Sequence, residues 1–372
     1  MLSGLETRLI NRNIRDKREM TLFSIDLKEL AEDIVSVSWS LFRVMIPTLI
    51  VVKIAQDLGA VDILDIWLQP ITEFIGLPAA LSIVLTTTML TNPYAGLIVL
   101  ASIDMISDLS VAETSILASF MLFAHALPVE AVISRQAGTK IIFVVCLRVL
   151  TAVIFCFLLN QVLTNFDLLQ HKALIHLPEF QVTPSWFEWS VDQIKGLIFI
   201  QIVITALLTA LAILKIVGIE RLIALCMRPF LNLIKIDENA STIMVVGLTL
   251  GLGFGGGLMI KEVKAGHVNK MQALSALVFI NLFHSVFEDT ALMMLLGPSL
   301  LVILVLRFLF CVLVAFLLIT AFRILAWPIV EWACVSSKSF PSTANVNPPP
   351  KPKPRVNPTT IIVEAFSSIL IK

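Results

Sequence analysis

The chain has 372 residues, of which 58% are hydrophobic and 15% are charged, and its formal net charge is zero. Soluble domains carry about 25% charged residues, so this composition excludes an ordinary soluble protein. Several apolar stretches reach the roughly 18 to 20 residues with which a helix crosses a ~30 Å hydrocarbon layer. The sequence therefore predicts an all-α polytopic membrane protein, with the lipid bilayer as a partner and no nucleic acid polymer.

The first 37 residues are rich in Lys and Arg and contain no apolar stretch directly after these charges. That pattern does not fit a cleavable signal peptide, and we expect residues 1–37 to form a cytoplasmic amphipathic segment. The five cysteines of the chain show no paired spacing, so the sequence predicts no disulfide framework.

A first membrane unit is expected over residues 38–160. Its segment Leu77–Ile103 is apolar but interrupted near the middle by Pro93 and Gly96. Proline removes a backbone donor and glycine relaxes φ, so we expect two half-helices that form a re-entrant hairpin. The other expected elements of this unit are crossing helices at 38–58, 111–133 and 141–160.

An extracytoplasmic linker is expected at 161–190, followed by a second membrane unit over residues 191–326. The broken segment of the second unit, about Ser241–Ile260, contains a glycine-rich run and also predicts a re-entrant hairpin. Its crossing helices are expected at 191–217, 271–295 and 299–326. Residues 327–372 are rich in Pro and Lys, which indicates an extended cytoplasmic tail.

The second unit repeats the first at a fixed offset of 159 positions. At this offset His125 meets His284, Glu130 meets Asp289, Gly138 meets Gly297 and Arg148 meets Arg307. Matches among His, acidic, Gly and Arg residues in one register are much harder to obtain by chance than matches among Leu and Val. We therefore interpret the two units as an internal duplication.

Equivalent loops of the two units carry opposite charge. Residues 102–113 have three acidic residues and no Lys or Arg, whereas the matching loop has Lys261, Lys264 and Lys270. Because Lys and Arg concentrate on the cytoplasmic side, the units should be inserted upside down relative to each other. The sequence thus predicts six crossings in the inner (cytoplasmic) membrane of the cell, with both termini in the cytoplasm.

Inverted repeats that each hold a broken hairpin followed by two spans resemble the Gate domain, also called the nucleoside recognition domain. This domain is shared by concentrative nucleoside transporters, the ferrous-iron transporter core and spore-maturation membrane proteins. The stretches that carry the resemblance are Phe123–Ile133 with Gly138, and Gly251–Glu262, and it covers most of residues 40–320. The resemblance implies a two-hairpin membrane fold of the kind used for transport.

Ionisable residues inside the predicted spans are the main candidates for a site. A charge at membrane depth costs about 2.5–3.5 kcal/mol, so such groups face a cavity or a partner. His284 and Glu288 are four residues apart and should share a helix face, whereas His125 and Glu130 diverge unless Pro128 kinks their helix. We interpret these groups as a proton- or cation-coupling pair at each hairpin; the alternative is that they only fix helix packing.

The hairpin tips supply further candidates, because half-helix termini and free backbone groups can hold ions or polar groups. Glycines there permit close approach of a solute, and they also serve as ordinary packing residues. The full set of candidate solute- or ion-binding residues is His125, Glu130, His284, Glu288, Asp289, Asn92, Tyr94, Gly253, Gly255, Gly256 and Gly257.

Two arginines lie inside predicted spans, and a buried guanidinium needs a partner. We expect structural ion pairs of Arg148 with Glu130 and of Arg307 with Asp289, or contacts with hairpin carbonyls. The sequence predicts no catalytic residue and no cofactor, and it leaves open whether a metal binds.

Three functions are compatible with these features. The first is a secondary transporter that moves a small polar solute, nucleoside-like or an ion, by alternating access through the two hairpins. The second is a membrane scaffold or receptor that recruits a partner through the tail. The third, a membrane enzyme, is disfavoured because no HExxH motif occurs and the close pair His171 and His176 lies in the linker. A homo-oligomer is compatible with all three.

Overall fold

The computed structural model describes residues 27–58, 69–103, 106, 108–178, 185–217, 229–230 and 238–340. The chain divides into two units, Met1–Phe340 and Pro341–Lys372, and the structure below is that of the first. The predicted features at residues 1–26 and 341–372 lie outside the described residues. In the described part of the chain the regular elements are helices, joined by turns and two isolated bridges, which agrees with the all-α prediction.

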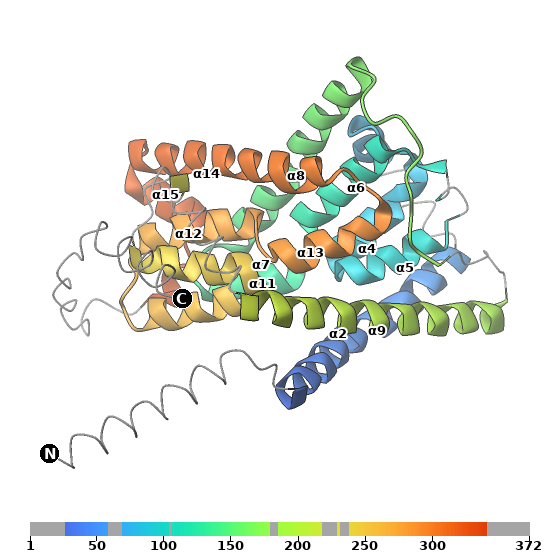
Figure 1. The fold of residues 1–372 in the computed structure, drawn as a ribbon. Helices are drawn as coiled ribbons and strands as arrows, with labels where there is room; N and C mark the ends of the chain where they lie inside the picture. The colour runs from blue at the N-terminus through green and yellow to red at the C-terminus, as the bar shows by residue number, and fades with distance from the viewer. Residues whose placement is uncertain are drawn as a thin grey trace, which may run out of the picture. The chain divides into compact units, whose positions relative to one another are not determined.

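Twelve helices of eight residues or more form the described part of the first unit (Figure 1). They are α2 (Leu27–Asp57), α4 (Ser82–Leu90), α5 (Pro93–Ala101), α6 (Val111–Ala124), α7 (Leu127–Gln136), α8 (Ile141–Asn165), α9 (Trp186–Val217), α11 (Glu238–Lys264), α12 (Lys270–Leu282), α13 (Val286–Met293), α14 (Arg307–Ile324) and α15 (Trp327–Cys334). A π-helical turn, Leu301–Leu306, precedes α14.

Five segments of the described residues are long and apolar enough to cross a membrane. They are Val111–Gln136, Ile141–Asn165, Trp186–Ala210, Lys270–Leu296 and Leu301–Ile324. These segments coincide with five of the six predicted crossing helices. The sixth prediction, residues 38–58, overlaps all but one residue with α2, which ends at Asp57 and is not among the five.

Both predicted hairpin segments contain a break. The helices α4 and α5 pack against each other and are separated at Thr91–Asn92, where the Asn92 side chain accepts a hydrogen bond of 2.9 Å from the Ala95 N–H. In α11 the break is Gly251, with φ 85° and ψ 172°, a conformation that is essentially restricted to glycine. These two breaks, at Asn92 and Gly251, are 159 positions apart, the same offset that relates the two units in sequence.

Two predicted crossing helices are also broken, and the expectation of continuous helices there is wrong. The segment 111–133 divides into α6 and α7 at Ala126, and the segment 271–295 divides into α12 and α13 at Ser285. Ala126 and Ser285 adopt the left-handed conformation, with φ of 48° and 46°, again at an offset of 159 positions. The chain therefore changes direction at equivalent points of both segments.

The predicted boundaries at 37/38 and 326/327 do not coincide with structural boundaries. α2 runs without interruption through residue 38, and α8 and α9 extend into both ends of the predicted linker. At the other end, α15 packs on α14, and the Lys140 N–H donates to the Cys334 carbonyl at 2.8 Å. Residues 327–340 thus belong to the first unit, and the tail begins after Phe340.

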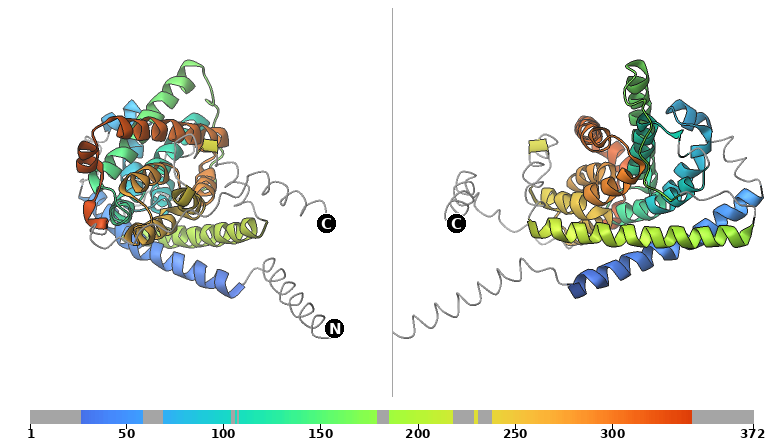
Figure 2. Two further views of the ribbon diagram at one scale, coloured as in Figure 1. Left: turned by 90° about the vertical axis from the view of Figure 1, so that its left-hand side faces the viewer. Right: turned by 45° about the vertical axis from the view of Figure 1, so that its right-hand side comes forward.

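Helices from the two halves of the chain pack on one another (Figure 2). The helix α7 contacts α11, α8 contacts α12 and α14, and the long helices α2 and α9 lie against each other. The α6 and α12 halves of the broken segments are deeply buried, with nearly every side chain in them enclosed. The two breaks consequently lie inside the helical bundle.

Candidate functional site

Two histidines occupy the two breaks at the centre of the bundle. His125 follows the last residue of α6, and His284 follows α12 by two positions. Each lies near the middle of a segment of 26 or 27 residues that is long enough to cross the membrane. With exposed fractions of 4% and 3%, both side chains are buried. The sequence placed both residues in spans, and the structure brings them together.

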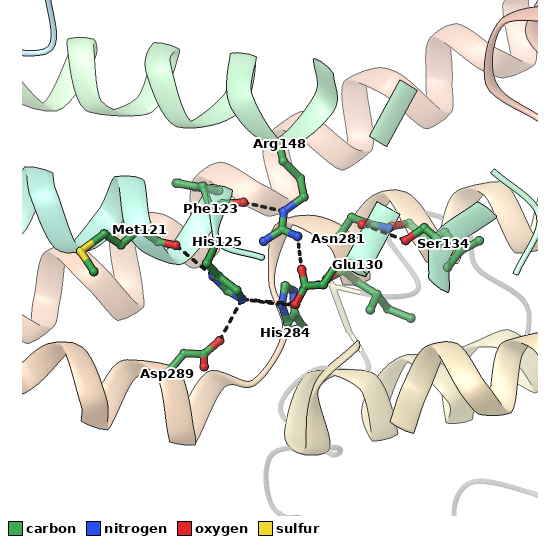
Figure 3. A network of polar contacts seen from close by, with 11 residues as sticks. Met121, Phe123, His125, Glu130, Ser134, Arg148, Asn281, His284 and Asp289 are labelled. Carbon is green, nitrogen blue, oxygen red and sulfur yellow. Dashed lines mark hydrogen bonds and ion pairs between the residues drawn. The ribbon is translucent and has the colours of Figure 1, made fainter. Parts of the chain in front are cut away.

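The two imidazole rings face each other across the boundary between the halves (Figure 3). Their Nε2 atoms are 3.1 Å apart. The opposite nitrogen of each ring, Nδ1, donates to a backbone carbonyl four residues earlier, that of Met121 for His125 and that of Ile280 for His284, both at 2.9 Å. These carbonyls are freed because α6 and α12 end there, so the helix breaks themselves orient the rings.

Two carboxylates complete the cluster (Figure 3). Oε1 of Glu130 lies 3.2 Å from Nε2 of His284 and 3.4 Å from Nε2 of His125. Oδ2 of Asp289 lies 3.6 Å from Nε2 of His125. Both acids stand in the first turn of a helix, Glu130 in α7 and Asp289 in α13, where the helix dipole favours a negative charge. The break at Ala126, rather than a kink at Pro128, brings Glu130 to the histidines.

Arg148 of α8 forms the predicted ion pair. Its Nη1 contacts Oε2 of Glu130, and its Nε donates to the Phe123 carbonyl at 2.6 Å. The guanidinium thus satisfies one more carbonyl freed at the end of α6 and fixes Glu130 from the side opposite the histidines. Arg148 itself is fully buried.

Arg307 of α14 occupies the equivalent position but has different surroundings. Its guanidinium carbon lies 4.6 Å from the ring centroid of Phe283 and 6.0 Å from that of Phe123. Its Nε and Nη1 have no hydrogen-bond partner among the described residues, and the predicted ion pair with Asp289 is not among those formed there. Cation–π contact with Phe283 is the main interaction that the structure shows for this charge.

Glu288 is hydrogen-bonded to Tyr94 rather than to the histidines. The hydroxyl of Tyr94, which comes from α5 of the first hairpin, donates to Oε1 of Glu288 at 3.0 Å. The prediction that His284 and Glu288 share a helix face is wrong, because His284 lies before the break and Glu288 after it. The Tyr94–Glu288 contact instead ties the first hairpin to the second half of the chain.

The remaining candidate residues are Asn92 and four of the glycines of α11. Asn92 caps its own helix α5. Gly256 packs against Ile133 of α7, whereas Gly257 has open space where a Cβ would lie. Gly253 and Gly255 belong to the helical part of α11 after the break. No hydrogen bond or ion pair of the described residues links Asn92 or these glycines to the histidines.

Residues that the sequence analysis missed hold the breaks in place. The Ala126 N–H donates to the Thr88 carbonyl of the first hairpin at 3.0 Å. Gly251 lies so close to Ser285 that a Cβ on Gly251 would clash with the Ser285 hydroxyl. Each of the two segments predicted to form hairpins therefore contacts the break of its own half. The break at Ser285 could have been suspected because Ser285 is a polar residue inside an apolar segment. Nothing in the sequence indicates a break at Ala126.

A second polar contact links the halves beside the cluster (Figure 3). The Ser134 hydroxyl of α7 donates to Oδ1 of Asn281 at 3.0 Å, and Nδ2 of Asn281 donates to the Leu277 carbonyl at 2.8 Å. Both residues are buried. An Asn inside a predicted span was a signal that could have identified this pair.

A surface pocket of about 550 Å³ lies apart from the histidines, between the ends of α7 and α8 and the helix α15. It is lined by Arg135, Lys140, Pro328, Glu331, Trp332, Val335, Ser336 and Ser337. The Lys270 ammonium donates a hydrogen bond to Glu331 and holds the pKa of that carboxyl below its ordinary value. The pocket thus has Arg135 and Lys140 of the first half in its lining, and Lys270 of the second half is bonded to its residue Glu331.

The chain is similar to an uncharacterized membrane protein, YvoD, of Bacillus subtilis (strain 168). The two are 26% identical over 264 residues, which cover 70% of this chain and 83% of that protein. Five apolar segments of membrane-crossing length agree with this similarity. This chain is a multi-pass membrane protein. No family model and no solved structure matches it, and the resemblance to the Gate domain stays a prediction.

Proposed function

We propose that this protein is a secondary transporter that moves a small polar solute, nucleoside-like or an ion, across the membrane by alternating access. In this proposal residues 38–160 and 191–326 are two inverted units of Gate-domain type, and the solute site is the cluster of His125, His284, Glu130 and Asp289. The one observation that carries the proposal is that both halves contribute equally to a buried polar cluster where two membrane-length segments are broken.

The equivalence of the two halves supports the inverted-repeat part of the proposal. The backbone breaks at Ala126 and Ser285, the histidines and the acids Glu130 and Asp289 all recur at one offset. Secondary transporters built from inverted repeats place the solute near the midplane, between broken helices of the two repeats. A cluster built by two equivalent units can open to either side by similar motions.

The cost of the cluster supports a functional role. Buried ionisable groups destabilise a membrane protein, and apolar residues of similar volume often pack as well or better. Here the bundle encloses two histidines, two arginines and the acids Glu130 and Asp289. A protein that needed only packing would gain nothing from this arrangement, whereas a transporter needs polar groups at membrane depth.

The proposed orientation follows from the basic residues. Arg135, Lys140 and Lys270 meet at one end of the bundle, around α15. Since Lys and Arg concentrate on the cytoplasmic side, this end faces the cytoplasm in the proposed topology, and the protein resides in the inner membrane with both termini inside.

A ligand-dependent thermal shift on the purified protein tests this proposal. The probes are uridine, adenosine, adenine, citrate, Mn²⁺ and Zn²⁺, each titrated against the protein in detergent. We expect one class to raise the melting temperature in the native chain and in His171→Ala, an exposed histidine that serves as a matched control. The shift should be lost in His284→Ala and Asp289→Asn. Stabilisation that survives in both cluster variants would place the solute elsewhere and contradict the proposal.

A further inference from the structure

The hydrogen bonds of the two histidines determine where their protons lie. Nδ1 of His125 and Nδ1 of His284 each face a backbone carbonyl at 2.9 Å. A carbonyl oxygen only accepts, so Nδ1 must carry the hydrogen in both rings. A neutral imidazole has one N–H, and its other nitrogen, Nε2, then presents a lone pair. In its neutral form each ring therefore directs an Nε2 lone pair into the cluster.

Four electron-pair donors converge as a result. The two Nε2 atoms are 3.1 Å apart. Oε1 of Glu130 lies 3.2 Å from Nε2 of His284 and 3.4 Å from Nε2 of His125, and Oδ2 of Asp289 lies 3.6 Å from Nε2 of His125. Oδ2 of Asp289 has no hydrogen-bond partner among the described residues, although Asp289 is only 8% exposed. Donors this close repel one another unless a positive species lies between them.

The spacing of these atoms matches the coordination sphere of a metal ion. A tetrahedral ion with metal–ligand distances of about 2.0–2.1 Å separates its ligand atoms by about 3.3 Å. Four of the six separations among these atoms are 3.1 to 3.6 Å and lie on both sides of that value. One ligand atom each from His125, His284 and Asp289 lies within 4.8 Å of the others. The donor set needs little rearrangement to hold an ion.

The residues behind the donors also fit a metal site. Histidines that bind metals characteristically donate their other N–H to a carbonyl or carboxylate, which fixes the tautomer. Both rings do so here. Arg148 orients Glu130 from outside the ring of donors, and Arg307 is directed to Phe283 rather than into the ring. Neither guanidinium group therefore occupies the centre of the cluster, so a cation can bind there.

We propose that His125, His284 and Asp289 bind a divalent first-row transition-metal ion, with Glu130 as the fourth ligand. Imidazole nitrogens suit Zn²⁺, Fe²⁺ and Ni²⁺, whereas Mg²⁺ and Ca²⁺ prefer sites made of oxygen ligands alone. If the proposed transport function holds, this ion is also the transported solute; that assignment rests on the proposed function.

Titration of the purified protein with Co²⁺ tests the site itself. The protein must carry no polyhistidine tag, because a tag would bind the same ions. We expect one equivalent of Co²⁺ to give the visible d–d absorption of a tetrahedral nitrogen–oxygen site, and Zn²⁺ to abolish it. Asp289→Asn keeps the shape of the side chain and should raise the Co²⁺ dissociation constant at least about 10-fold, and His284→Ala should raise it at least about 100-fold.

The control is a chain with His171→Ala and His176→Ala, two exposed histidines outside the cluster, which should bind Co²⁺ like the native chain. Size-exclusion and circular dichroism profiles establish that each variant is folded. Absence of a Co²⁺ spectrum in the folded native chain would overturn the metal site. Binding that persists unchanged in Asp289→Asn and His284→Ala would overturn it as well.

Uptake into proteoliposomes separates the site from its role in transport. With a metal-sensitive dye inside the vesicles, we expect Zn²⁺ or Mn²⁺ entry that Asp289→Asn reduces at least about 10-fold. Stoichiometric binding without entry of either ion would overturn the assignment of the metal as solute, while the metal site itself would stand. Uptake of uridine without Co²⁺ binding would overturn the metal proposal and leave the proposed transport function intact.

Discussion

His125 and His284 are separated by 159 residues in the chain, yet their Nε2 atoms are 3.1 Å apart. Each ring comes from the break in a segment long enough to cross the membrane, and each is oriented by a carbonyl of the helix that precedes it. The pair lies at the point where the two halves of the chain meet. Motion of one half against the other would change this contact, so the proposed alternating access can be tested there.

Replacing Arg148 by Met should destabilise the protein strongly. The substitution leaves Glu130 buried without its guanidinium partner and leaves the Phe123 carbonyl without a donor. Breaking a buried ion pair by removing one partner costs about 3–5 kcal/mol, which thermal unfolding in detergent can detect. Adding Glu130→Gln to Arg148→Met should recover part of the loss, because the unpaired charge is then gone. Equal stability of Arg148→Met and the native chain would show that the pair is not a structural element.

Gly251→Ala should destabilise the break within α11. The backbone at Gly251 has φ 85° and ψ 172°, and a Cβ there would meet the Ser285 hydroxyl. A strained backbone of this kind costs about 1–3 kcal/mol, which should lower the melting temperature. Gly257→Ala is the matched control, since no atom lies where its Cβ would be and Ala favours a helix over Gly by up to about 1 kcal/mol. A loss as large in Gly257→Ala as in Gly251→Ala would contradict the assigned break.

Ala126→Gly should stabilise the protein by up to about 1 kcal/mol. Ala126 has φ 48°, a left-handed conformation that costs a non-glycine residue about 1–2 kcal/mol. The same change inside α6, Ala118→Gly, should have the opposite sign, because Gly is unfavourable in a helix interior by about 1 kcal/mol. Chemical denaturation of the two variants gives the comparison. If both substitutions destabilised equally, α6 and α7 would be one continuous helix.

Tyr94→Phe should weaken the contact between the first hairpin and α13. The Tyr94 hydroxyl donates to Glu288 at 3.0 Å, and a hydrogen bond to a charged group contributes about 1.5–3 kcal/mol. In a double-mutant cycle with Glu288→Gln, the two effects should not add, since both substitutions remove or alter one interaction. Additive losses in that cycle would show that the two side chains act independently.

The sequence revealed the features of this protein that depend on local chemistry. The helix break at Asn92 follows from the pair Asn92–Pro93, because asparagine caps a helix and proline starts one. The break at Gly251 falls in the predicted glycine run. The pairing of Arg148 with Glu130 was predicted from the need of a buried charge for a partner. In each of these cases the type of one or two residues is enough to predict the helix break or the ion pair.

The breaks at Ala126 and Ser285 could not be predicted in the same way. Neither residue favours the left-handed conformation, and the flanking sequences are apolar enough to read as continuous helices. The Thr88 carbonyl holds Ala126 and the hairpin glycine Gly251 leaves room for Ser285, so contacts distant in sequence impose both breaks. The environment of Arg307 was missed for a similar reason, because its contact with Phe283 depends on the turn that the second break produces.

Accessibility of Ser285→Cys tests the alternating-access account most directly and needs no knowledge of the solute. The variant is made in a chain whose five native cysteines are replaced by alanine, and Ala126→Cys serves as its matched counterpart at the other break. A membrane-impermeant thiol reagent is applied to right-side-out and to inside-out vesicles. The account predicts that the reagent modifies Cys at position 285 from both sides of the membrane. Modification from one side only, or from neither side when the unfolded protein reacts fully, would contradict it.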